Sequence, residues 1–277
     1  MTLNFREVDV FCSHGFDGNP LGVVHNADQL SDSQMQTIAN WTNFSETTFL
    51  VQPSVATADY RVRIFTPFEE LPFAGHPTLG SAHAWLEAGG TPSQTSKVVQ
   101  ECGIGLVTLR QDGGRLRFEA PPLIRSGPPD ESVRLRTLAV MGLDDSEVAN
   151  VEWIDNGPRW IGVELVDLAR IGSLTPSPVD DDEVDIAVFS IGSGLEGVDV
   201  ELRCFFGPDV REDPVTGSAN ASVAVYLQTH DKVRFPYVAA QGNYMGRNGR
   251  AYVSAESDGS LWVGGDVRTV VVGHIDV

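Results

Sequence analysis

The stretch Glu70-Leu-Pro-Phe-Ala-Gly-His-Pro-Thr78 decides the fold of this chain, because a related stretch follows in the second half of the sequence. That second stretch, Glu212-Asp-Pro-Val-Thr-Gly-Ser-Ala-Asn220, carries Glu, Pro and Gly at the matching places. Each copy is preceded by an Arg-x-Phe segment, Arg63–Phe65 or Arg203–Phe205, and is followed by an Ala-rich segment of helical character. A strand, a loop and a helix in the same order at both places indicate an internal duplication. We therefore predict two related halves.

Short strands dominate the regions around the two stretches. Alternation of apolar and polar residues predicts strands along most of the chain, beginning with Phe5–Phe11. Helices are predicted from Ser31 or Ser33 to near Asn43, from His76 to Glu87, from Glu131 to Met141, and after Gly217. Many strands with few helices are typical of an α+β fold.

The segment APPLIRSGPPD, residues 120–130, is rich in Pro and is the best linker candidate. It divides the chain into an N-terminal half, residues 1–120, and a C-terminal half, residues 121–277, whose last strand can return to the first half. The length of 277 residues is sufficient for two such sub-domains.

The composition and the net charge indicate which binding partners and which cellular compartment to expect. A net charge of -19 would repel phosphate backbones and anionic lipids, so we expect neither nucleic-acid nor membrane partners. No apolar run reaches the roughly 18 residues that a membrane helix needs. The first residues, MTLNFREVDVF, lack the basic and apolar regions of a secretory signal. We expect a cytoplasmic protein.

The three cysteines, Cys12, Cys102 and Cys204, lie far apart in apolar, strand-like surroundings. A free thiol in such a context usually serves as a small core residue. An odd number of distant cysteines argues against a disulfide framework and against a zinc site. We expect no bound metal.

Both copies of the repeat open a helix with glycine, in Gly75-His76-Pro77-Thr78 and in Gly217-Ser218-Ala219. Unpaired amide groups and the positive end of the helix dipole make such a start suitable for an anion, here a substrate carboxylate. The alternative is that these are only well-capped helices. The candidate substrate-binding residues are Gly75, Pro77, Thr78, Thr216 and Gly217.

Glu46 is the candidate acid/base residue. It lies in NFSETTFL, between the end of a predicted helix and a strand, where side chains commonly point into a cleft. The apolar neighbours Phe44 and Phe49 could raise its pKa towards neutrality, which suits proton transfer. The alternative is a capping or surface role for Glu46. Asp213, next to Pro214, can likewise be a simple helix cap, and His76 can be structural.

Five phrases of the sequence, taken in order, form a recognisable set. They are Gly18-Asn-Pro-Leu-Gly-Val23, Ser45-Glu-Thr-Thr-Phe49, Phe65-Thr-Pro67 with Glu70-Leu-Pro-Phe-Ala-Gly-His-Pro-Thr78, Asn156-Gly-Pro-Arg-Trp160, and Glu212-Asp-Pro-Val-Thr-Gly-Ser-Ala219. Together they resemble the PhzF-like family of phenazine-biosynthesis isomerases. The resemblance extends from about Phe5 to the closing glycine-rich strands.

The resemblance implies a diaminopimelate-epimerase-like fold. In that fold two similar α+β halves each curl a mostly antiparallel sheet around a central helix, with a pseudo-twofold axis and an active-site cleft between the halves. It implies Glu46 as the residue that takes a proton from one carbon of a dihydro-hydroxyanthranilate ring and returns it to another. Residues His76, Asp213 and Ser218 would assist, and the helix-opening glycines would hold the carboxylate. It also implies a homodimer without a cofactor.

Two other functions stay open. The related epimerases and racemases use paired cysteines just before the helix-opening glycines, where this chain has Ala74 and Thr216. An amino-acid epimerase or racemase would therefore have to use Glu46 with Asp213 or His76. A non-catalytic protein that binds small carboxylates is the third possibility. The motifs do not identify the substrate beyond a small carboxylate, cyclic or amino-acid-like.

Overall fold

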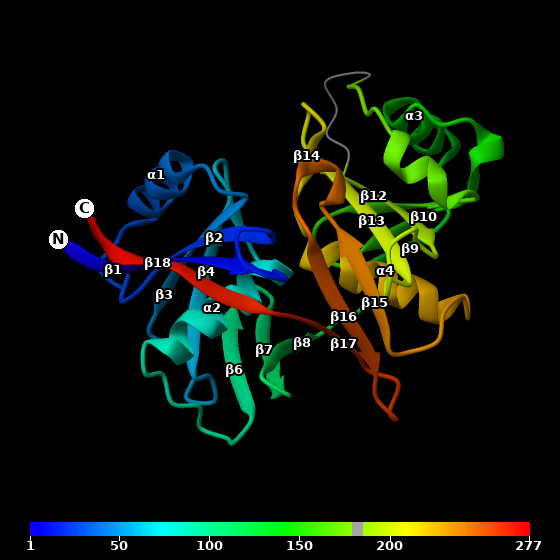
Figure 1. The fold of residues 1–277 in the computed structure, drawn as a ribbon. Coiled ribbons are helices and arrows are strands. Elements are labelled where there is room, and N and C mark those ends of the chain that lie inside the picture. The colour runs from blue at the N-terminus through cyan, green and yellow to red at the C-terminus, as the bar shows by residue number, and fades with distance from the viewer. Residues whose placement is uncertain (179–184) are drawn as a thin grey trace. The chain divides into compact units, whose positions relative to one another are not determined.

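The structure, a computed structural model, describes residues 1–178 and 185–277, and the chain divides into two compact units. Unit 1 comprises Met1–Glu119 and Gly264–Val277, and unit 2 comprises Ala120–Val263. Figure 1 shows both units as ribbons. The last strand belongs to unit 1, where it lies beside the first strand.

Unit 1 is built on a mostly antiparallel sheet. Its strands are β1 (Thr2–Val10), β2 (Asn19–Val24), β3 (Glu46–Val51), β4 (Tyr60–Phe65), β5 (Glu70–Leu71), β6 (Lys97–Cys102), β7 (Gly105–Asp112), β8 (Arg115–Glu119) and β18 (Val267–Asp276). Strand β1 pairs antiparallel with β18 and β2, while β2–β3 and β4–β6 are parallel pairs. The pairs β3–β4, β4–β5, β6–β7 and β7–β8 are antiparallel.

Unit 2 repeats this order of pairings. Its strands are β9 (Arg125–Gly127), β10 (Val148–Asp155), β11 (Trp160–Leu165), β12 (Asp185–Ile191), β13 (Val200–Phe206), β14 (Arg211–Asp213), β15 (Tyr237–Gln241) and β16 (Gly249–Ala255), followed by β17 (Leu261–Gly265), which leads back into unit 1. Strand β10 pairs antiparallel with β9 and β11, and β11–β12 and β13–β15 are the parallel pairs. The pairs β12–β13, β13–β14 and β15–β16 are antiparallel. The matching topology supports the internal duplication.

Four α-helices are present in the described ranges, namely α1 (Asp32–Thr42), α2 (Gly75–Glu87), α3 (Glu131–Met141) and α4 (Gly217–Thr229), with short 3-10 turns η1 (Asp145–Glu147), η2 (Leu168–Ser173) and η3 (Asn243–Met245). Helix α1 begins at a capping box in which Ser31 and Gln34 satisfy each other's backbone N–H groups, so Ser31 rather than Ser33 is the cap. It ends at Asn43, which adopts the left-handed conformation. None of the helices in residues 1–178 and 185–277 has the length and apolar character needed to span a bilayer.

Each unit places one buried helix against its sheet and a second helix on the other side. Helix α2 contacts β1, β2 and β3 as well as β6, β8 and β18, so the sheet of unit 1 curves around it. Helix α4 contacts β10, β11 and β16 in unit 2. The outer helices cover separate apolar clusters, one that includes Met35 of α1 and Phe49, and one that includes Met141 of α3 and Val163. The architecture is α+β, as predicted.

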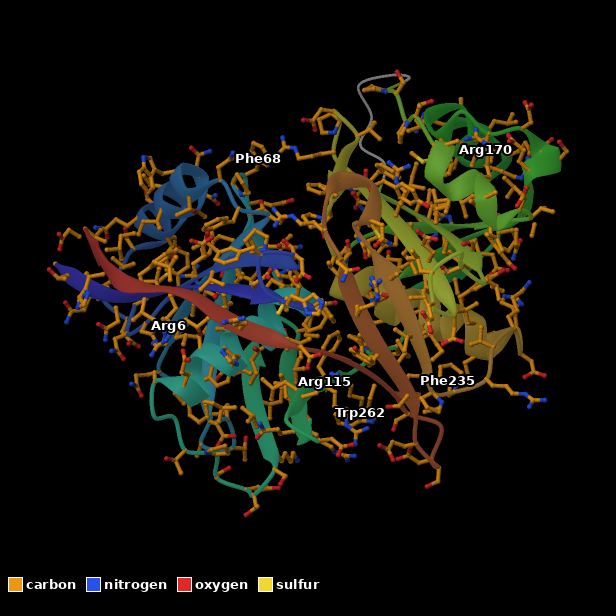
Figure 2. All side chains as sticks on the ribbon, viewed as in Figure 1. Arg6, Phe68, Arg115, Arg170, Phe235 and Trp262 are labelled. Atoms are coloured by element: carbon orange, nitrogen blue, oxygen red, sulfur yellow. The ribbon has the colours of Figure 1, made fainter. Side chains whose placement is uncertain are left out.

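An arginine–glutamate pair fixes the approach to the central helix in each unit. Arg63 donates from Nε and Nη2 to the two oxygens of Glu70 over 2.7 and 2.6 Å. Arg203 donates in the same bidentate way to Glu212 over 2.9 and 2.8 Å. Such fork-to-fork pairs are geometrically specific. In unit 1 a further bidentate pair joins Arg115 of β8 (labelled in Figure 2) to Asp266, just before β18.

Candidate active site

Glu46 is the first residue of β3 and lies directly against the start of α2. Its Oε2 atom is 3.2 Å from Nδ1 of His76, the second residue of α2. The side chain of Glu46 is 15% exposed, whereas that of His76 is 3% exposed. Asn19, the first residue of β2, places its Nδ2 atom 3.5 Å from the same imidazole nitrogen. The structure thus brings together two of the predicted catalytic residues and adds Asn19.

The imidazole of His76 is neutral near pH 7. Burial lowers its pKa to about 3, and the Pro20 carbonyl only partly opposes this effect. The contact with Glu46 is therefore between an imidazole and a carboxyl group rather than between two full charges. The two groups are in close contact, with 3.2 Å between Nδ1 of His76 and Oε2 of Glu46.

The first turn of α2 exposes backbone donors rather than side-chain ones. Its N-cap residue, Ala74, makes no side-chain cap, and the first N–H groups of any helix lack intrahelical acceptors. Pro77 has no N–H, which leaves Gly75 and His76 as the donors of this turn. The hydroxyl of Thr78 donates to the Ala74 carbonyl over 2.9 Å and accepts from Gln100 over 3.0 Å. These bonds favour a structural role for Thr78.

In unit 2, Asp213 belongs to a buried hydrogen-bond network. The Thr216 hydroxyl donates to Oδ2 of Asp213 over 2.6 Å and accepts from Nε2 of Gln241 over 2.8 Å. Gln241 also donates to the Asp213 carbonyl and accepts from the Thr216 N–H and from Asn220. Thr216, rather than Asp213, is the N-cap residue of α4. The network holds the loop rigidly in front of that helix.

Ser218 is the second residue of α4, the same helical position as His76 in α2. Its hydroxyl oxygen accepts the indole N–H of Trp160 over 3.1 Å. Gly217 precedes it at the helix start, where the backbone amides point along the helix axis. Glu46 and His76 meet in unit 1, Asp213 and Thr216 meet in unit 2, and the cleft implied by the family resemblance stays a prediction.

Of the three thiols, that of Cys204 lies against the unit 2 network, beside Thr216, Gln241 and Asp213. The residues before the helix-opening glycines, Ala74 and Thr216, are the N-caps of α2 and α4. All three cysteines are free and buried. Burial raises the pKa of Cys12 to about 12, and it also raises the pKa values of Cys102 and Cys204. Thiols of this kind are neither nucleophiles nor proton carriers near neutral pH.

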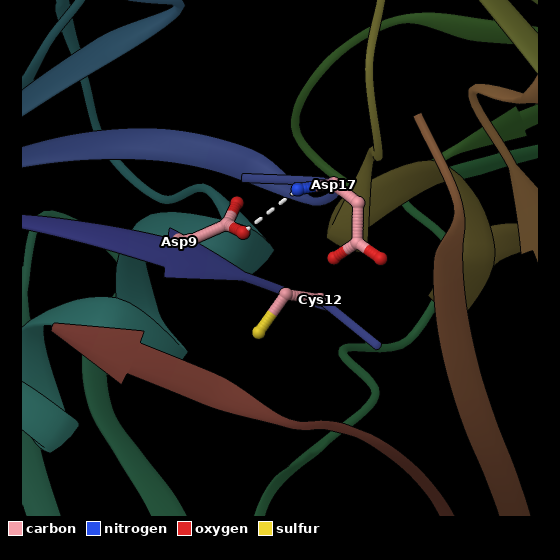
Figure 3. A group of neighbouring side chains, drawn as sticks. All are labelled: Asp9, Cys12 and Asp17. Atoms are coloured by element: carbon pink, nitrogen blue, oxygen red, sulfur yellow. Dashed lines mark hydrogen bonds between the residues drawn. The ribbon is translucent and has the colours of Figure 1, made fainter. Parts of the chain in front are cut away.

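One further group of potential ligands, Asp9, Cys12 and Asp17, gathers at the β1–β2 loop (Figure 3). The carboxylate of Asp9 accepts the N–H groups of Asp17 and Gly18, both over 3.0 Å. The carboxylate of Asp17 accepts N–H groups from residues 13–15 of the same loop. These bonds explain both carboxylates as loop supports. The loop leads directly into Asn19, so the group orders the backbone beside His76.

Asn19 and Trp160 lie in the sequence motifs given above, and Gln241 lies outside them in QGNYMGR, residues 241–247, but none of these stretches indicates the residues' roles. Their contacts depend on which strand ends meet which helix starts, and spacing along the chain does not specify that. The best available signal was their position inside the phrases GNPLGV, NGPRW and QGNYMGR.

The two units with their buried helices define a protein of epimerase-like fold. A predicted epimerase from Pseudomonas aeruginosa superposes with a TM-score of 0.81 at 26% identity over 99% of each chain. A hydroxyproline epimerase from Agrobacterium vitis shares the fold with a TM-score of 0.63 at 14% identity, over 99% of this chain and 92% of that one.

The chain belongs to the PhzC-PhzF family of phenazine biosynthesis-like proteins, whose model matches residues 8–273. It is 34% identical to the trans-2,3-dihydro-3-hydroxyanthranilate isomerase of Pseudomonas aeruginosa, over 91% of this chain and 90% of the relative. It is also 35% identical to the protein named antisense-enhancing sequence 1 of Schizosaccharomyces pombe, over 98% of this chain and 97% of that protein. The family relationship confirms the resemblance seen in the sequence and identifies an isomerase.

Proposed function

We propose that the protein is a cofactor-independent isomerase that shifts a proton between two carbons of a small carboxylate, with Glu46 as the acid/base. One observation carries the proposal: the Glu46 carboxyl contacts the neutral imidazole of the buried His76 at the first turn of α2. The neutral imidazole adds no full charge beside Glu46, which leaves the carboxyl able to take up and release a proton.

The reaction moves one proton and leaves the oxidation state of the substrate unchanged. The Glu46 carboxylate takes a proton from an activated C–H group, and the electron pair of that bond enters the conjugated system of the substrate. The protonated Glu46 then returns the proton to a second carbon, where the displaced electron pair forms the new C–H bond. Glu46 ends as it began, so no co-reactant is consumed.

The helix starts supply the complementary part of the proposal. Carboxylates bind favourably to backbone N–H groups at helix N-termini. Gly75 in unit 1 and Gly217 with Ser218 in unit 2 are the proposed carboxylate-binding residues, each at the first turn of a buried helix. Asp213, held by Thr216, is proposed to assist proton handling.

The substrate class is proposed from chemistry and kinship together. The relative that is 34% identical is named for trans-2,3-dihydro-3-hydroxyanthranilate, a small cyclic carboxylate. We propose a substrate of this kind, cyclic or amino-acid-like. Racemisation by two thiols is disfavoured because Ala74 and Thr216 occupy the two positions before the helix-opening glycines.

Solvent-deuterium incorporation followed by NMR tests the proposal. The wild type is incubated in D2O with trans-2,3-dihydro-3-hydroxyanthranilate and with a panel of small amino and unsaturated carboxylic acids. Deuterium should enter one compound with the wild type, and Glu46→Gln should abolish its incorporation. Glu69→Gln, which makes the same change at an exposed position, is the matched control. Incorporation that survives Glu46→Gln contradicts the proposal, and inversion of a stereocentre would identify an epimerase instead.

A further inference from the structure

Two residues around the β10–β11 connection form hydrogen bonds with Ser218. Trp160, the first residue of β11, donates its indole N–H to Oγ of Ser218 over 3.1 Å. Asn156, just after β10, donates from Nδ2 to the backbone carbonyl of Ser218 over 3.0 Å. All three residues are buried, with exposed fractions of 4% or less. Asn156 thus fixes the main chain of the second residue of α4, and Trp160 fixes its side chain.

The chemistry of the indole decides the direction of the Ser218 hydroxyl. An indole N–H is a donor only, so the serine oxygen must accept, and its own hydrogen has to point elsewhere. Among the hydrogen bonds of residues 1–178 and 185–277, that oxygen takes part only in the bond from Trp160. A buried hydroxyl hydrogen without an acceptor is costly, which points to an acceptor that arrives with a ligand.

We propose that Trp160 is a positioning residue that makes the Ser218 hydroxyl an obligatory hydrogen-bond donor to an anionic oxygen of the substrate. This rests on the proposed function, in which the start of α4 receives a carboxylate. A serine without this constraint can rotate and present either its hydrogen or its lone pairs to a ligand. With the indole in place it presents its hydrogen.

The equivalent position in unit 1 carries the same kind of contact. Asn19, the first residue of β2, lies with its Nδ2 atom 3.5 Å from Nδ1 of His76, the second residue of α2. The first residue of β2 in unit 1 and the first residue of β11 in unit 2 thus each contact the side chain of the second residue of the central helix, α2 or α4. The repetition indicates that this strand position serves to orient the helix-start side chain.

Unit 2 offers a matched control for Trp160. Trp262 of β17 (labelled in Figure 2) is also buried, and its indole N–H donates to Oγ of Ser260 over 3.1 Å. Trp262→Phe therefore removes the same hydrogen bond between the same residue types, but not at the start of α4. Ser260→Ala is the corresponding control for Ser218→Ala.

The first measurement follows the indole N–H signals of the five tryptophans by nitrogen-15 NMR. Trp160→Phe identifies the signal of Trp160. Ser218→Ala should shift this signal and speed its exchange with solvent, whereas Ser260→Ala should affect only the signal of Trp262. Addition of 3-hydroxyanthranilate, the aromatic analogue of the relative's substrate, should shift the Trp160 signal. If the Trp160 signal is unchanged by Ser218→Ala, or unchanged by 3-hydroxyanthranilate, the proposal is overturned.

The second measurement is the dissociation constant of 3-hydroxyanthranilate, read from the same titrations. Trp160→Phe and Ser218→Ala should each weaken binding about three- to tenfold, the range for one net hydrogen bond. The double variant should bind no more weakly than Ser218→Ala alone, because both changes remove one interaction. Trp262→Phe should leave binding unchanged. Additive losses, or a loss in Trp262→Phe equal to that in Trp160→Phe, overturn the positioning role.

Failure of this proposal can be told apart from failure of the proposed function. If deuterium exchange survives Glu46→Gln while Trp160 and Ser218 remain coupled in binding, the acid/base function is wrong and the positioning role stands. If Glu46→Gln abolishes exchange while Trp160→Phe behaves like Trp262→Phe, the reverse holds. Should Trp160→Phe fail to fold, Ser218→Ala compared with Ser260→Ala carries the test.

Discussion

The first turns of α2 and α4 show one backbone arrangement with two different chemistries. Both helices begin with a glycine that follows an extended residue, and both bury the second residue. In unit 1 that residue is His76, in contact with a carboxyl group, and in unit 2 it is Ser218, in contact with an indole. The duplicated fold therefore fixes the position of the second helix residue in both units. The residue type at that position, histidine or serine, determines which contacts and which chemistry are available there.

The arginine–glutamate pairs show the opposite relation, with equal chemistry in unequal surroundings. The side chains of Arg63 and Glu70 are 19% and 41% exposed, and those of Arg203 and Glu212 are 8% and 15% exposed. Arg203 also donates to the carbonyls of Ile171 and Leu174. The pair in unit 2 is therefore more buried, and its arginine also holds two backbone carbonyls.

The largest difference that we expect between the two units is in catalytic activity, when the acidic residue of each unit is replaced by its amide. Glu46→Gln should lower the isomerisation rate about 10²- to 10⁴-fold, the usual contribution of a general acid/base. Asp213→Asn should cost about tenfold, because an amide oxygen can still accept the Thr216 hydroxyl. The rates are measured as kcat/KM with the substrate found by deuterium exchange. Equal losses would contradict the assignment of the proton carrier to unit 1.

Removing each arginine should separate the two ion pairs by stability. Arg203→Met should lower the free energy of unfolding by about 3 kcal/mol, because it leaves Glu212 and two carbonyls buried without their partner. Arg63→Met should lower it by about 1 kcal/mol or less, since its pair is partly exposed. Urea unfolding measures both values. Similar losses would show that burial does not distinguish the two pairs.

Acid should weaken unit 1 before unit 2. Burial and the Arg6 guanidinium lower the pKa of His25 to about 4, and burial lowers that of His76 to about 3, against an ordinary value of 6.5. The folded state therefore binds fewer protons than the unfolded state below pH 6.5. Stability should fall as the pH drops from 6.5 towards 4, by up to about 1.4 kcal/mol per pH unit for each histidine.

Hydrogen exchange at pH 7 and pH 5 locates this effect. Amides of unit 1 should lose more protection than those of unit 2, whose only histidine is the partly exposed His230. His25→Gln should reduce the slope of stability against pH between 6.5 and 4. A uniform loss of protection in both units would mean that these histidines do not govern the acid response.

The smallest effect is expected from the thiols. Iodoacetamide at neutral pH should leave the activity within about twofold of its starting value, because the raised pKa values of Cys12, Cys102 and Cys204 keep buried thiols protonated. Activity and alkylation are followed together, the latter by mass spectrometry. If activity is lost in parallel with the alkylation of one cysteine, that thiol is needed for activity and the prediction is wrong.

The repeat and its flanking patterns predicted most of the fold from the sequence. The duplication, α3 at Glu131–Met141 and the start of α4 at Gly217 all follow from local signals such as glycine starts and alternating strands. The contact of Glu46 with His76 could not be predicted from local signals. It joins the first residue of β3, a strand that pairs in parallel with β2, to the start of α2, which lies further along the chain. Thr78 illustrates this limit. Its place in the first turn after Gly75 suggested ligand binding, yet its hydroxyl donates to the Ala74 carbonyl and accepts from Gln100.

The return of β18 to unit 1 has a consequence for synthesis on the ribosome. Strand β1 keeps one unpaired edge until β18 has been translated, and all of unit 2 is translated between them. Unit 2, whose residues are contiguous, can acquire its sheet and α4 while the half that contains Glu46 still lacks a strand. A nascent chain arrested after Val263 should therefore resist protease in unit 2 and be cleaved in unit 1, so the half that contains Glu46 would fold last.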